Sequence, residues 1–65
     1  MTFDPEEIVT LYGEGQMTLR SAVKRVMAKA RHERIGATIF RDGNPSILSL
    51  AQIEVLAGDL GIASA

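Results

Sequence analysis

The chain has 65 residues, a formal net charge of −1 and 46% hydrophobic residues. A chain of this length forms a single domain, here residues 1–65, and buries only about 60% of the surface that its unfolded form exposes. It has no cysteine and one histidine, which excludes disulfides and argues against a zinc site made of protein ligands. Because it has no apolar run of about 18 residues and no charged-then-apolar N-terminus, we expect a cytoplasmic protein with no membrane partner.

The first predicted element is a helix over about residues 5–12. Asp4 is placed to act as its N-cap, Pro5 occupies the first helical position, and Glu7 completes a capping box. The apolar stripe of this helix comprises Ile8, Leu11 and Tyr12. Residues 13–16 then form a loop, since the glutamate between its two glycines opposes phosphate binding. We expect this first helix to cover the core.

The second predicted helix begins near Thr18 and runs to about Arg34, and Gly36 ends it. Its apolar residues recur at helical spacing and cover an arc of about 140°. These residues are Leu19, Ala22, Val23, Val26, Met27 and Ala30. The pattern predicts that one side of the helix packs against the core while the other side faces solvent.

The exposed side of this second helix is strongly basic. It carries six of the seven basic residues of the chain, Arg20, Lys24, Arg25, Lys29, Arg31 and Arg34. Beside the small residues Ser21 and Ala28, one positive row comprises Arg20, Lys24 and Arg31, and the other comprises Arg25, Lys29 and His32. Only one acidic residue, Glu33, lies in this stretch. Such a surface binds the phosphates of nucleic acid, docks an acidic protein, or remains a solvated helix side. The sequence pI of about 5.7 argues against a dedicated nucleic-acid binder, so all three interpretations stay open.

Residues 37–48 predict a β-hairpin that turns at Asp42 and Gly43. Its two faces carry Phe40 with Ile47 and Ile39 with Leu48. A two-stranded hairpin is marginal alone, and helices cover only one of its faces, so we expect a second copy of the chain to cover the other. The prediction is a homodimer whose candidate contacts are Ile39, Phe40 and Ile47.

A last helix is predicted over about residues 50–60. Ser49 and Gln52 form a capping box at its start, and Gly61 ends it. Its buried stripe comprises Ile53, Leu56, Ala57 and Leu60. The fold class expected from these elements is α+β, a small domain with the order helix, helix, β-hairpin, helix.

The segment Ile39–Leu48, with Glu54 and Leu56 after it, resembles the hairpin of Phd/YefM-type antitoxins. That family follows an alanine-containing helix with a strand, an R-x-G-x-P motif, a second strand and another helix. The motif positions in this chain are Arg41, Gly43 and Pro45. The resemblance covers residues 37–56 and implies a dimer formed through this core, DNA binding by the N-terminal part, and toxin binding by a C-terminal tail.

Groups suited to catalysis are scarce in the sequence. No serine or threonine has a base beside it, and the only histidine, His32, lies among the cations. We therefore predict no enzyme, no metal and no cofactor, and expect a small non-catalytic regulatory or binding protein. The first hypothesis is an antitoxin-like regulator that binds nucleic acid through the six basic residues. The alternative is a protein-interaction module that docks an acidic partner and binds no nucleic acid.

Overall fold

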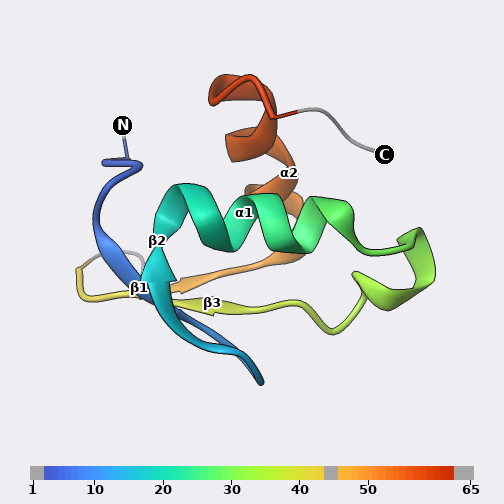
Figure 1. The fold of residues 1–65 in the computed structure, drawn as a ribbon, viewed down its shortest axis with the longest axis horizontal. Helices are drawn as coiled ribbons and strands as arrows, with labels where there is room; N and C mark the ends of the chain where they lie inside the picture. The colour runs from blue at the N-terminus through green and yellow to red at the C-terminus, as the bar shows by residue number, and fades with distance from the viewer. Residues whose placement is uncertain (1–2, 44–45, 63–65) are drawn as a thin grey trace.

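The computed structural model describes residues 3–43 and 46–62 and shows an α+β fold with one four-stranded antiparallel sheet and two α-helices (Figure 1). The strands are β1 (Ile8–Leu11), β2 (Gly15–Thr18), β3 (Ile39–Phe40) and β4 (Ile47–Leu48). The helices are α1 (Leu19–Ala28), the short 3-10 helix η1 (Arg31–Glu33) and α2 (Leu50–Asp59). Two hairpins thus each precede a helix along the chain.

The sheet has the strand order β2-β1-β3-β4, so the two hairpins lie side by side in it. β1 pairs with β2 along its whole length, from Ile8 opposite Thr18 to Leu11 opposite Gly15. β1 also pairs with β3, where Leu11 lies opposite Ile39. The N-terminal hairpin is therefore joined to the second hairpin by backbone pairing between residues almost thirty positions apart in the sequence.

A single hydrophobic core lies between the sheet and the two helices. The strands contribute Val9, Leu11, Ile39 and Leu48, all of which are almost fully buried. The helices contribute Leu19, Ala22, Val23, Val26 and Met27 from α1 and Ile53, Leu56 and Ala57 from α2. Both helices therefore cover the same face of the sheet (Figure 1). Because strand side chains alternate between faces, the residues next to the buried ones point away from the helices.

The predicted helix over residues 5–12 is wrong. Its capping residues close only one turn, in which the amide of Glu6 donates to the Asp4 carboxylate at 2.9 Å. The carbonyls of this turn accept the first amides of α1: Leu19 donates to Glu7 at 2.8 Å and Arg20 donates to Pro5 at 2.9 Å. The turn at the predicted cap therefore accepts hydrogen bonds from the first amides of α1 and does not begin a helix at residue 5.

The residues after this turn form strand β1 for identifiable reasons. Ile8, Val9 and Thr10 are β-branched and favour extended backbone. Gly13 and Gly15 adopt φ values of 83° and 102°, which the turn of the first hairpin requires. The predicted order of helix, helix, β-hairpin, helix is thus replaced by β-hairpin, helix, β-hairpin, helix.

The second predicted helix begins where the sequence places it but ends early. The hydroxyl of Thr18 accepts a hydrogen bond from the Ser21 amide at 3.2 Å, as an N-cap does. At the other end Lys29 is extended, with ψ of 154°, so the predicted end near Arg34 is wrong. Ala30, predicted in the buried stripe, is exposed beyond the helix.

The hairpin within 37–48 and the helix over 50–60 are confirmed as β3, β4 and α2. The predicted two-residue turn at Asp42 and Gly43 is wrong, because Phe40 lies opposite Ile47 and more than two residues connect the strands. The amide of Arg41 donates to the Ser46 carbonyl at 2.8 Å across the hairpin, whose residues 44–45 lie outside the described part. The amide of Ser49 donates to the Gln52 side chain at 3.0 Å, as the predicted capping box requires. Gly61 follows α2 with φ of 71°.

Candidate functional site

The structure divides the six predicted basic contacts into three groups. Arg20, Lys24 and Arg25 lie on the exposed side of α1, and Lys29 follows at its C-cap. Arg31 is exposed in η1, beyond the end of the helix. We call Arg20, Lys24, Arg25 and Lys29 the α1 basic surface. Ser21 and Ala28 are exposed beside it, as predicted.

Arg34 does not belong to a binding surface, which corrects the prediction for this residue. It is only 4% exposed. Its guanidinium donates to the Met27 carbonyl at 2.7 Å and to the Lys29 carbonyl at 3.0 Å. Carbonyl groups at the end of a helix lack partners within the helix, so Arg34 stabilises the C-terminus of α1. The sequence shows no local signal for this role because the acceptors lie five and seven positions away.

The turn between β1 and β2 brings a carboxylate to the α1 basic surface. Glu14 lies 2.9 Å from the Lys29 ammonium and 3.2 Å from the Arg25 guanidinium. The hydrogen bond from Lys29 lowers the pKa of Glu14 below its ordinary value, and Arg25 adds to this effect. Sequence reasoning placed Glu14 in a loop and gave it no partner.

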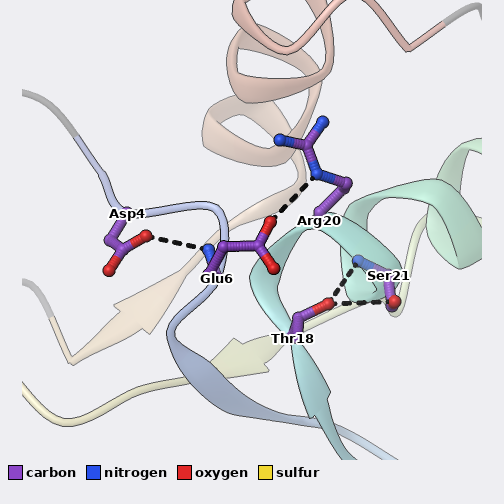
Figure 2. Close-up of polar contacts among 5 residues, drawn as sticks. All are labelled: Asp4, Glu6, Thr18, Arg20 and Ser21. Atoms are coloured by element: carbon purple, nitrogen blue, oxygen red, sulfur yellow. Dashed lines mark hydrogen bonds and ion pairs between the residues drawn. The ribbon is translucent and has the colours of Figure 1, made fainter.

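A second carboxylate approaches the other end of the α1 basic surface. Figure 2 shows the side chain of Arg20 directed at Glu6. The Arg20 Nε and Glu6 Oε2 atoms are 3.3 Å apart, and both side chains are exposed. The turn that begins at Asp4 fixes Glu6 in this place, and the N-cap Thr18 fixes the start of the helix that carries Arg20 (Figure 2). Exposed ion pairs of this kind contribute about 0–1 kcal/mol, so phosphate oxygens can replace the carboxylate at little cost.

Lys24 and Arg31 differ from the other exposed cations. Within residues 3–43 and 46–62, neither has a carboxylate within ion-pair distance. Four cations of the α1 basic surface thus face two carboxylates, and Lys24, near the middle of the helix, has no ion-pair partner among the described residues. The surface keeps a positive local charge although the whole chain is slightly acidic.

The seventh basic residue has a structural role that the sequence did not indicate. Arg41 forms an ion pair with Glu7 at 3.0 Å, and both side chains are mostly buried. Its guanidinium also lies 4.9 Å from the centre of the Phe3 ring. These contacts hold the N-terminal turn against the second hairpin.

The sheet presents a second exposed surface on the side away from the helices. It consists of Ile8, Thr10, Tyr12, Gln16, Phe40 and Ile47, and we call it the outward sheet face. Tyr12 is 70% exposed, and its ring contacts that of Phe40 edge-to-face with centres 6.4 Å apart. Of the predicted dimer contacts, Phe40 and Ile47 lie on this face. Ile39 does not, because it is fully buried in the core.

An open groove of about 480 Å³ runs along α2. Its lining residues are Phe3, Ala51, Gln52, Val55, Leu56, Asp59 and Leu60. The groove is mainly apolar, and its one charged residue is the carboxylate of Asp59. It is therefore chemically unlike the α1 basic surface.

Groups that would support metal chemistry do not gather in the part of the chain that the structure describes. There, no three residues among histidine, aspartate and glutamate come together in a metal-binding arrangement. His32 is exposed in η1. Neither α1 nor α2 has the length and apolar character that crossing a membrane requires.

Comparison of the chain with protein-family models, with curated proteins and with solved structures found no match. The fold and its surfaces define a small α+β domain with the α1 basic surface on one side of the core and a sheet face of uncharged strand residues on the other.

Proposed function

We propose that this protein is a small non-catalytic binding protein that contacts the phosphate groups of nucleic acid through the α1 basic surface. The observation that carries the proposal is the geometry of Lys24. It lies exposed on α1 between Arg20 and Arg25 and has no carboxylate partner among the described residues. Cations held on one helix side neutralise successive phosphates and release their counterions, which is the main source of sequence-independent affinity.

The neighbouring carboxylates do not block this role. Glu6 and Glu14 reach the surface from other elements through exposed ion pairs, which are weak in water. Ser21 and Ala28 are small and exposed, so a backbone can approach the helix closely beside the cations. Together these features support phosphate contact along the length of α1.

The order of elements supports a regulator of the antitoxin-like kind. The resemblance to Phd/YefM-type antitoxins implies a helix, a strand, a turn, a second strand and another helix. Elements α1, β3, β4 and α2 follow in that order, and Arg41 and Gly43 of the motif lie at the turn. The third motif position, Pro45, lies outside the described residues. Regulation through nucleic acid is the function that this order and the α1 basic surface favour jointly.

A second candidate function is the docking of an acidic protein on the same surface. One observation favours it: carboxylates already fit these cations, at 2.9 Å for Lys29 with Glu14 and 3.3 Å for Arg20 with Glu6. An acidic segment of a partner would replace Glu14 and Glu6 in the same geometry. Phosphate and carboxylate partners are distinguished by titration with a duplex and with an acidic peptide.

The test is fluorescence anisotropy of a labelled duplex titrated with the protein at several salt concentrations. Lys24→Gln removes one phosphate contact, so affinity should fall several-fold and the slope of log K against log salt should decrease by about 1. Ala51→Glu is the matched control because it lowers the net charge by the same amount from an exposed position on α2. Binding that is absent, independent of salt, or equally weakened by both variants contradicts the proposal.

A further inference from the structure

We propose that the outward sheet face is an interface between two copies of this chain. The first observation is the exposure of large apolar side chains on that face. Ile8, Tyr12, Phe40 and Ile47 are 60%, 70%, 39% and 52% exposed. All four lie on the side of the sheet that the helices leave open. Contiguous apolar groups on a small protein mark an interaction site, whereas single ones are ordinary.

The distribution of charge on the outward sheet face indicates which kind of partner can bind it. No residue of the four strands is charged. Glu14, at the turn between β1 and β2, is directed to α1 by its ion pairs, and Glu7 and Arg41 are paired and mostly buried. Asp42, which also lines this face, is exposed and repels phosphates and acidic side chains, so neither a nucleic acid nor an acidic protein is favoured here. A second copy presents the same uncharged strand residues, which is what an isologous interface requires.

The shape of the face fits a two-fold arrangement. The ring of Tyr12 contacts that of Phe40, and Phe40 also lines a depression of about 150 Å³ together with Ile8, Thr10 and Gln16. A space of about 150 Å³ holds one benzene ring. Its lining also includes Arg41 and Asp42, and is mainly polar.

Consider a two-fold axis that lies in the interface plane, perpendicular to β1 and level with Leu11. This axis places the two copies of β1 antiparallel to each other across the interface. Tyr12 of each copy then lies over the depression of the other, because Tyr12 and Thr10 are on opposite sides of that axis. The Tyr12 phenol suits the polar lining, since its ring is apolar while its hydroxyl can pair with Thr10 or Gln16.

The size of the molecule matches such a dimer. The chain exposes 4163 Å². A standard interface buries about 800 Å² per partner, which is roughly a fifth of that surface. One side of a molecule measuring 28 × 24 × 17 Å supplies an area of this order. A domain of this size also has little stability to spare, and association that buries more apolar surface adds to it.

The test is sedimentation equilibrium of the full chain from micromolar to submillimolar concentration. The wild type should approach twice the 7.0 kDa mass of one chain. Tyr12→Lys should raise the dimer dissociation constant by about tenfold or more, because it removes the aromatic ring that fills the partner's depression and adds a charge that must be desolvated. Ile35→Lys and Val55→Lys are matched controls, since they remove exposed apolar residues outside the outward sheet face and should leave the dimer intact.

Circular dichroism shows whether each variant is folded, and Ile47→Lys gives a second probe of the face should Tyr12→Lys unfold. A wild type that remains monomeric at every concentration overturns the proposal. So does a dimer that persists in Tyr12→Lys and Ile47→Lys while Ile35→Lys or Val55→Lys dissociates it. Neither result depends on nucleic-acid binding, so this proposal and the proposed function fail independently.

Discussion

The α1 basic surface and the outward sheet face lie on opposite sides of one core and differ in what their exposed side chains contact. On α1 the charges are partly paired, because Glu6 and Glu14 approach Arg20, Arg25 and Lys29 from the N-terminal hairpin. The four strands of the sheet carry no charged residue, and on the outward sheet face the rings of Tyr12 and Phe40 contact each other. Binding at the α1 basic surface therefore exchanges one polar partner for another, whereas covering the outward sheet face removes apolar surface from water, which is favourable.

The largest expected effect is on the free energy of unfolding. It separates a core residue from a neighbouring residue on the outward sheet face. Leu11→Ala removes a buried side chain beneath the helices and should lower the free energy of unfolding by about 2–5 kcal/mol. Tyr12→Ala, one residue away and exposed, should lower it by about 1 kcal/mol or less in dilute protein. Urea denaturation measures both variants. Equal losses would mean that β1 does not separate an inward from an outward side.

The next effect separates the structural cation from the exposed ones. Arg34→Ala leaves the Met27 and Lys29 carbonyls without their donor and should lower the free energy of unfolding by about 1.5–3 kcal/mol. Lys24→Ala should change it by no more than about 0.5 kcal/mol. Thermal unfolding of both variants checks this difference. A stable Arg34→Ala variant would show that Arg34 belongs with the exposed cations after all.

The smallest effect concerns the carboxylate that shares the α1 basic surface. Glu14→Gln removes the partner of Lys29 and Arg25, so affinity for a duplex should rise a few-fold through reduced competition. The lowered pKa of Glu14 means that its pairs stabilise the fold above the ordinary carboxyl pKa and that this contribution is lost as pH falls through the folded-state value.

Unfolding at pH 7 and at pH 3 checks this dependence on pH. The wild type should be slightly more stable than Glu14→Gln at pH 7, and the difference should be smaller at pH 3. A difference that grows on acidification would contradict the role given to Glu14.

The parts of the fold that the sequence predicted are those with local signals. The second hairpin follows from the apolar arms that contain Ile39–Phe40 and Ile47–Leu48, although its connection is longer than the predicted two residues. Helix α2 follows from the capping pair Ser49 and Gln52. The start of α1 is fixed in the same way by Thr18. Each of these signals acts within a few residues, so neighbouring sequence is sufficient to identify it.

The predictions are wrong where residues distant in the sequence determine the local structure. Residues 8–12 fit both a helical stripe and a strand, and their pairing with β3 selects the strand. The end of α1 depends on Arg34, which folds back on the helix. The basic cluster was visible in the sequence, but its neutralising partners were not. Glu14 and Glu6 are 11 and 14 positions from the arginines that they meet, and only the folded hairpin brings them there.

The most direct test of the two-surface account compares Lys24→Gln and Tyr12→Lys in one experiment. Sedimentation of each variant, alone and with a labelled duplex, reports self-association and nucleic-acid binding together. The account predicts that Lys24→Gln stays dimeric and loses affinity for the duplex, while Tyr12→Lys becomes monomeric and each monomer still binds. If either variant lost both properties, or if each lost the property assigned to the other surface, the separation of the two surfaces would be contradicted.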